Sequence, residues 1–213
     1  MMFLDLRLSL IMCEDIIIEC VEDVSVDLLR GCCALFDENF EKTIAGNTIK
    51  IYPSRLKKYL VNSQLICVYK NDLLIGYMIT EKMTEELVWI KQIVVHKLFR
   101  NKRIGTYLVA MLKKYRKIGI ITNNPIMVKI IKSLGFSICL TQKIYEETFA
   151  NQYFKTMMKL YCVEDVEWHN NNYLAYTNLK NTQKITEFID CAPLSIINPG
   201  YEWIIISNSI LNR

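Results

Sequence analysis

The apolar positions of the first sixty residues predict one strand and two helices. A β-branched run over 15–23 predicts the strand. Apolar residues at helical spacing over 23–40 predict a helix, for which Asp23 or Ser25 is available as N-cap. A second, shorter helix is predicted over 53–61, where a Pro-Ser pair opens the pattern.

Three strand patterns follow at the spacing of hairpins. They cover 64–71, 73–82 and 87–95, and turn residues separate them at Asn71-Asp72 and near Thr84-Glu85. Consecutive strands joined by such short turns predict an antiparallel meander.

The meander leads into an alternation of helix and strand. Helical spacing over 105–117 predicts a helix that Gly119 ends, and 118–122 is a short strand pattern. A second helix is predicted over 124–136, with Asn124 as its cap. A strand-helix-strand crossover after a meander predicts a mixed α/β sheet.

A final hairpin, 137–145 with 153–161, closes a predicted domain of residues 15–162. The fold class is therefore a mixed, mainly antiparallel central sheet flanked by helices, with residues 163–213 as a C-terminal extension of unknown role. We expect the extension to pack on the sheet or to form a contact between the two copies of a homodimer, because about fifty residues cannot easily bury their apolar segments alone.

Composition places the chain among ordinary globular proteins, since 52% of its 213 residues are hydrophobic and 23% are charged. The apolar start is interrupted by Asp5 and Arg7, so no signal peptide is expected, and no run reaches the ~18 apolar residues of a transmembrane helix. Eight cysteines form no Cys-x-x-Cys pair and have no histidines at zinc spacing. We expect buried, reduced thiols, no metal site, no membrane partner and a cytoplasmic location.

Charge is distributed unevenly along the chain. The span 87–145 has no Asp or Glu and holds twelve of the 26 Lys and Arg residues, whereas the remainder has 14 basic against 22 acidic residues. This asymmetry predicts a polyanionic ligand for the middle of the chain and favours a cationic one elsewhere.

The cations are most crowded where the strand 87–95 gives way to a helix. Arg100, Lys102 and Arg103 surround this turn, close to Gly105. A helix start offers unpaired backbone N–H groups and the positive end of the helix dipole, which together favour an anion. The alternatives are a solvated turn or a nucleotide loop, but the segment lacks the Gly-Lys-Ser/Thr ending of a P-loop and does not follow a first parallel strand.

Residues 93–112, IVVHKLFRNKRIGTYLVAML, resemble the acetyl-coenzyme A signature of the GNAT superfamily of N-acetyltransferases. Arg100 matches the first position of the family's Arg/Gln-x-x-Gly-x-Gly/Ala motif, Gly105 its last glycine, and Thr106 the small residue that opens the helix. Residues 124–136 resemble the family's second signature at the matching distance.

The resemblance implies acetyl-coenzyme A as the acetyl donor. It implies that main-chain groups of Ile93, Val94 and Val95 bind pantetheine, and that a backbone N–H near Val94 or Val95 polarises the thioester carbonyl. Asn124 is implied to contact the pantetheine arm or to cap its helix. The diphosphate is implied to lie against the turn residues Arg100, Asn101, Lys102, Arg103, Ile104, Gly105 and Thr106.

Three positions depart from the family pattern. Arg103 stands in place of the first motif glycine, and Lys97 in place of a common proline. Ile131 stands where a tyrosine often protonates the departing coenzyme A thiolate, so that the acid is elsewhere or absent.

The acid and the base are the least defined parts of the predicted site. An amine must lose a proton to become a nucleophile, yet the strand 87–95 carries no carboxylate. Glu85 and Glu86 at its start, acting through water, are the candidate bases, and Glu81 lies across the hairpin; each also fits a solvated turn. Tyr145 is the candidate acid.

The predicted function is N-acetyltransfer from acetyl-coenzyme A directly to a primary amine. The acidic surplus outside 87–145 favours a polyamine, a protein lysine or a protein N-terminus over an amino sugar. One alternative is a GNAT fold that binds coenzyme A without turnover. A nucleic-acid-binding protein is disfavoured, because the cations divide between a turn and a helix end.

Overall fold

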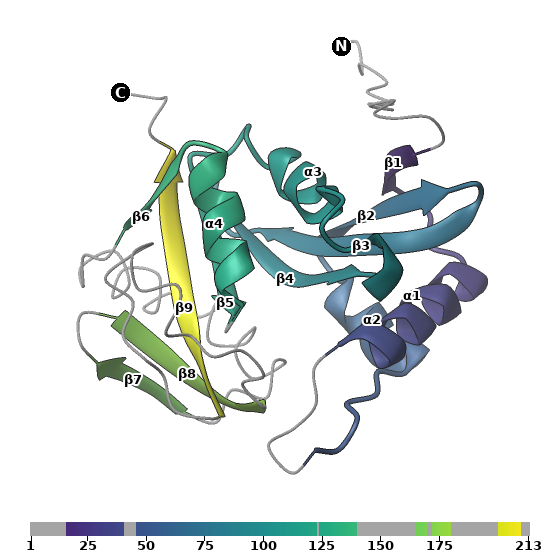
Figure 1. Cartoon of the computed structure of the whole chain (residues 1–213), viewed down its shortest axis with the longest axis horizontal. Coiled ribbons are helices and arrows are strands. Elements are labelled where there is room, and N and C mark those ends of the chain that lie inside the picture. Colours follow the sequence, from purple (N-terminus) through teal and green to yellow (C-terminus); the bar gives the residue numbers. More distant parts are fainter. Residues whose placement is uncertain are drawn as a thin grey trace.

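The computed structural model describes residues 16–40, 46–122, 124–139, 165–169, 172–179 and 200–209. Its strands are β1 (Ile16–Val21), β2 (Ser63–Lys70), β3 (Leu73–Lys82), β4 (Leu87–Val95), β5 (Lys117–Thr122), β6 (Phe136–Cys139), β7 (Asp165–His169), β8 (Asn172–Leu179) and β9 (Gly200–Ser209). They form one nine-stranded sheet in the order β1-β2-β3-β4-β5-β9-β8-β7, with β6 paired to β9 (Figure 1). Among these pairs only β4 and β5 are parallel.

The predicted meander is confirmed. β2, β3 and β4 pair in turn as antiparallel neighbours. Asn71 and Asp72 between β2 and β3 both have positive φ, 48° and 62°, the conformation that a tight two-residue hairpin requires. Asn and Asp tolerate this region better than most residues, so the turn follows directly from the local sequence.

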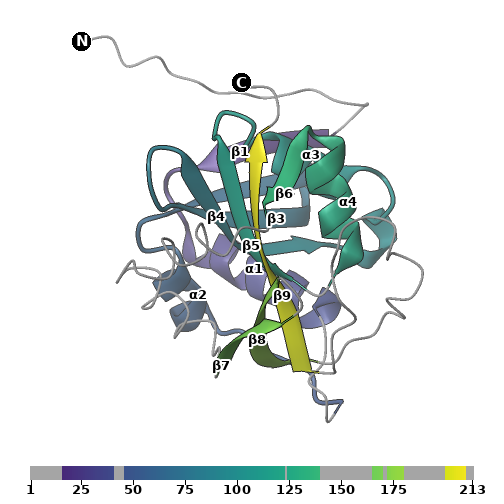
Figure 2. The ribbon, with the colours of Figure 1, turned by 90° about the vertical axis from the view of Figure 1, so that its left-hand side faces the viewer.

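Helices cover both faces of the sheet. The helices α1 (Val26–Asn39) and α2 (Pro53–Tyr59) lie on one face, while α3 (Ile104–Ala110) and α4 (Pro125–Ser133) lie on the other (Figures 1 and 2). Of the two candidate caps of α1, Ser25 is the one used: its hydroxyl accepts from Leu28 N. The predicted fold class, a mixed sheet flanked by helices, is confirmed.

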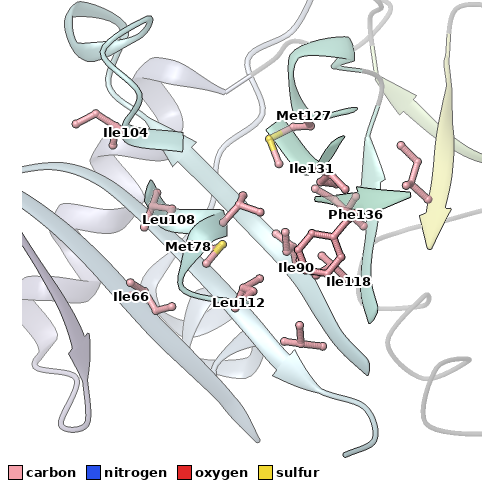
Figure 3. Packing of buried hydrophobic residues seen from close by; sticks show 14 of the residues in the cluster. Ile66, Met78, Ile90, Ile104, Leu108, Leu112, Ile118, Met127, Ile131 and Phe136 are labelled. Carbon is pink, nitrogen blue, oxygen red and sulfur yellow. The ribbon is translucent and has the colours of Figure 1, made fainter. Parts of the chain in front are cut away.

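Each face has its own apolar core. On the α3 and α4 side, Leu108 and Ile131 pack with Met78, Ile90 and other strand residues (Figure 3). On the opposite side the buried residues come from α1, α2, Ile51 before α2, and the alternate positions of β2, β3 and β4. Because strand side chains alternate between faces, this division tells which way each residue of β4 points.

The structure corrects the helix predicted over 105–117. Regular helix ends at Ala110, turns follow, and β5 begins at Lys117. Gly119, predicted to end the helix, lies inside β5 opposite Trp89.

The C-terminal part of the chain contributes to the middle of the sheet. β9 pairs with β5 on one side and with β6 and β8 on the other (Figure 2). β6, at the start of the first predicted hairpin arm, pairs with β9. The rest of that arm and the second arm, 153–161, lie outside the described residues, so the hairpin stays a prediction. β9 follows the predicted boundary at residue 162 in the sequence, yet it pairs with β5 and β6, which precede this boundary.

Within the described ranges, no helix is long and apolar enough to span a membrane, and no group of His, Cys, Asp and Glu side chains has the arrangement of a metal site.

Candidate active site

β4 separates from β5 halfway along its length. The two strands pair from Leu87 to Ile90 on β4, and no register pair joins them beyond Ile90 and Ile120. At the same point the β3–β4 register changes, because Thr80 faces Ile90 and Ile79 faces Gln92, which leaves Lys91 as the extra residue of a bulge. The segment 91–95 therefore borders a gap between diverging strands.

Main-chain groups of two residues point into this gap. His96 N donates to Ile75 O at 2.9 Å across the β3–β4 ladder. Hydrogen-bonded and non-hydrogen-bonded pairs alternate along an antiparallel ladder, so the main-chain groups of Val94 face β3 and those of Ile93 and Val95 face the gap. The side chain of Val94 is buried on the α1 and α2 side.

The cationic turn begins with a short 3-10 helix, η1 (Lys97–Phe99), which is held from two sides. His96 caps it by accepting from Leu98 N at 3.2 Å, and Asn39 at the end of α1 accepts from Lys97 N at 2.7 Å. Arg100 donates from its guanidinium to Asn39 O at 2.6 Å and to Val95 O at 3.3 Å. Two of its five N–H donors thus attach the turn to the protein, and three are available to an anion.

The two cations that follow Arg100 in the turn are exposed. Lys102 Nζ lies 5.1 Å from the centre of the Phe99 ring. Arg103 has φ 62° and ψ 8°, a left-handed conformation, and its side chain does not cap α3. Among the described residues, neither has an ion-pair partner. The position where the family has its first motif glycine thus keeps a glycine-like backbone while presenting a guanidinium.

Gly105 serves packing between helices. It lies within α3, and a Cβ at this position would be 3.3 Å from Ile130 Cδ1 of α4. Ile104 is buried in the core, Thr106 is half-buried, and Asn101 is exposed with φ 60°. Asn101, Lys102 and Arg103 are therefore exposed residues of the turn before α3.

Asn124 caps α4. Its Oδ1 accepts from Ile126 N at 3.0 Å, and its N–H donates to Thr122 Oγ1 at 3.0 Å. Ile131, at the position of the family tyrosine, is fully buried in the core, so no phenol is available there.

The predicted acid and bases lie away from the gap or outside the described residues. Glu86 is half-exposed at the start of β4, 3.2 Å from Arg116 and 3.9 Å from Lys117. Glu85 is paired with Lys82 at 2.6 Å. Tyr145 lies outside the described residues.

Glu81 occupies a different environment from the solvated turn expected for it. It is buried, and its Oε2 lies 2.6 Å from Lys91 Nζ. Lys91 also donates to Tyr59 O at 2.8 Å and Ser63 Oγ at 3.0 Å. The bulge residue is thus attached to α2 and to β3 together.

Sequence reasoning missed this pair and a second one, in which the Tyr77 hydroxyl donates to Gln92 Oε1 at 2.8 Å. Polar residues at inward-facing strand positions were the available signal, because long charged side chains are almost never fully buried without a partner.

Most of the cysteines in the described part of the chain have buried thiols. Cys32, Cys33 and Cys67 are buried as expected, whereas Cys20 is exposed. Burial raises the pKa of the Cys33 thiol to about 11, so a thiolate nucleophile at Cys33 is not favoured.

The sheet opens between two parallel strands, and a cationic turn that leads into a helix follows the opening. Residues 32–136 match the sequence model of the acetyltransferase (GNAT) family. The chain therefore carries a domain of this family of acyltransferases, and the predicted family and enzyme class are confirmed.

The fold agrees with that of a solved N-acetyltransferase structure. The ribosomal-protein-S18-alanine N-acetyltransferase from Escherichia coli shares 11% identity, covers 91% of this chain and 92% of its own, and has a TM-score of 0.51. PaiA N-acetyltransferase from Thermoplasma acidophilum, in complex with coenzyme A, is 15% identical over 61% of this chain and 94% of its own, with a TM-score of 0.48. A search of curated proteins finds no match to the chain.

Proposed function

We propose that this chain is an N-acetyltransferase that moves an acetyl group from acetyl-coenzyme A directly to a primary amine. The observation that carries the proposal is the opening of the sheet after Ile90, which leads to the cationic turn. Diverging strands expose main-chain donors and acceptors to an extended amide chain, and the turn supplies cations for phosphates.

The residues present fit this donor substrate. The main-chain groups of Ile93 and Val95 match the amides of a pantetheine arm, and either N–H can donate to a thioester oxygen as negative charge develops there. Lys102, Arg103 and the remaining N–H groups of Arg100 match a diphosphate. These assignments follow the family pattern with one refinement: Val94 contributes its side chain to the core instead of its main chain to the gap.

Transfer is direct in this proposal. The neutral amine nitrogen attacks the thioester carbonyl carbon, the C–N bond forms as the C–S bond breaks, and coenzyme A leaves as a thiolate that takes up a proton. The amine gives its proton to a base. Acceptors of this class are polyamines, protein lysines, protein N-termini and amino sugars.

Arg103→Gly tests the cofactor site. Glycine adopts the left-handed conformation without strain, so we expect unchanged or slightly greater stability. Loss of the guanidinium should weaken coenzyme A binding about 10- to 100-fold, since a hydrogen bond to a charged group contributes ~1.5–3 kcal/mol. Titration calorimetry measures the affinity, and thermal unfolding measures the stability.

Lys113→Glu is the matched control for charge, because Lys113 is exposed in the turn that follows α3. It changes the net charge by more than Arg103→Gly does, and we expect less than a threefold effect on affinity. A wild-type chain that does not bind coenzyme A, or an Arg103→Gly variant that binds it with wild-type affinity, contradicts the assignment.

The base remains a prediction, with Glu86 and then Glu85 as its candidates. If Glu86 acts through water, Glu86→Gln should lower kcat at neutral pH by about 10²-fold and the loss should shrink at high pH, where more amine is neutral. If Glu86 only pairs with Arg116 and Lys117, kcat stays at the wild-type value and stability changes by at most ~1 kcal/mol. A pH profile of kcat separates the two outcomes.

A second candidate function is coenzyme A binding without turnover. It is favoured by two observations: Ile131 is buried where the family has a tyrosine, and both candidate bases are ion-paired far from the gap. Product analysis by mass spectrometry after incubation with acetyl-coenzyme A and a panel of amines distinguishes it from the first.

A further inference from the structure

The Tyr77–Gln92 pair lies where β4 leaves β5. Gln92 is the first residue after the bulge, in the segment that has no partner on β5, and it is half-buried. Tyr77, on β3, is fully buried, and its hydroxyl donates to Gln92 Oε1 at 2.8 Å. A polar contact is therefore built into the wall of the gap.

Tyr77 fixes which way the Gln92 amide points. Burial, with nearby Cys32 and Cys33, raises the pKa of Tyr77 well above its ordinary value, so the hydroxyl keeps its proton at working pH. Rotating the amide by half a turn would leave this buried O–H without an acceptor, which is costly. The amide oxygen is thus held toward Tyr77, and the NH₂ group is directed away from it.

The NH₂ group is available to a ligand. Among the described residues, Gln92 makes no side-chain hydrogen bond other than the one with Tyr77. Gln92 lies two positions before Val94 and shares its face of the sheet, where α1 and α2 pack. Two N–H donors of fixed direction therefore lie on the α1 and α2 face of the segment that also carries the main-chain groups of Ile93 and Val95.

The preference of this part of the gap comes from the Gln92 side chain itself. Glu81, the carboxylate of β3 on the same face, is held by Lys91, whereas Asp37 of α1 accepts from a main-chain group, Ile51 N, at 3.0 Å. Gln92 offers a neutral hydrogen-bond donor, which recognises an oxygen rather than an ammonium group.

We propose that Gln92 is a specificity-determining residue that donates to the carbonyl oxygen next to the acceptor amine, so that the acceptor is the α-amine of a peptide. This inference rests on the proposed function. In the N-terminal residue of a peptide, the carbonyl carbon is bonded to the carbon atom that carries the amine. When the amine lies at the thioester, the carbonyl oxygen therefore lies next to Gln92 of β4. A polyamine has no such oxygen.

Gln92→Glu and Gln92→Leu test the proposal in the full chain. Both remove the donors, and we expect kcat/KM for a short peptide with a free N-terminus to fall at least tenfold, mainly through KM, because a site built to hydrogen-bond an oxygen loses binding without that bond. Gln92→Glu also turns donors into an acceptor, so activity on spermidine relative to peptide should rise. Tyr77→Phe frees the amide to rotate and should raise the peptide KM by a smaller factor.

Gln64→Glu is the matched control, since Gln64 is exposed on β2, and it should leave both activities unchanged. Equal losses for peptide and spermidine in Gln92→Leu, or a wild-type chain that prefers spermidine or an amino sugar, overturn the proposal.

A binding measurement separates this inference from the proposed function. The side-chain amide signal of Gln92 in an ¹⁵N spectrum is assigned by its loss in Gln92→Leu. It should shift when peptide is added, whether or not acetyl transfer occurs. If added peptide does not shift the signal, the inference is rejected, even when the enzyme is active. If the signal shifts but coenzyme A does not bind, only the proposed function is rejected.

Discussion

Lys91→Met is expected to lower the free energy of unfolding by about 3–5 kcal/mol. The substitution keeps most of the side-chain volume but leaves the buried Glu81 carboxylate without its counter-charge, and breaking a buried pair at one partner has this cost. Glu81 Oε1 already has no hydrogen-bond partner among the described residues, so nothing there replaces Lys91. Urea unfolding followed by circular dichroism measures the change.

Two variants control this experiment. Lys82→Met breaks an exposed pair, Lys82–Glu85, and should cost at most ~1 kcal/mol. Lys91→Met/Glu81→Met replaces both buried charges by apolar groups and should recover most of the loss. If Lys82→Met and Lys91→Met have equal effects, or the double variant is no more stable than Lys91→Met, the buried pair does not have the energetic role assigned to it.

Gly119→Ala is expected to destabilise the protein by about 3 kcal/mol or more. A Cβ at Gly119 would lie 2.1 Å from Trp89 Cε3 and 2.3 Å from Cζ3, and Trp89 is fully buried, so the indole ring cannot swing aside. Overpacking of a rigid core element forces side chains off their rotamers and shifts the backbone. Because Gly119 and Trp89 face each other across β5 and β4, the shift should also disturb the opening of the sheet.

Gly31→Ala is the matched control for this second substitution. Gly31 lies in the middle of α1, and a Cβ there would be 3.6 Å from Leu74 Cδ2, an ordinary contact. Alanine should therefore raise stability by about 0.5–1 kcal/mol through helix propensity. Thermal unfolding of both variants gives the comparison, and a Gly119→Ala variant that unfolds at the wild-type temperature contradicts the packing argument.

Much of the candidate site could be read from the sequence because its parts are local. Arg100 to Thr106 are consecutive, and the turn, the short helix and the cations come from one stretch of chain. The cap at Asn124 is likewise a contact between near neighbours, as is the Asn71-Asp72 hairpin. Local rules for turns and caps act over a few residues, so they can be recognised without knowledge of the fold.

What the sequence could not supply are the partners of those residues. The sequence predicts a phosphate contact for Arg100, and the structure adds that two of its donors bind Asn39 O and Val95 O, with Asn39 61 positions away. The sequence predicts an anion near Gly105, and the structure adds that its missing side chain makes room for Ile130 of α4. Each of these contacts depends on how elements distant in sequence pack together.

The sequence by itself determined the strands and helices from β1 to β4, the meander and the cationic turn of this protein, because hydrophobic period, turn residues and caps are encoded over short spans. Only the tertiary structure decided that β9 fills the place beside β5, that Gly119 accommodates Trp89, and that Lys91, Glu81, Tyr77 and Gln92 pair at the opening of the sheet. The physical reason is that burial and strand register are set by contacts between distant segments, and a single residue's polarity does not reveal which partner satisfies it.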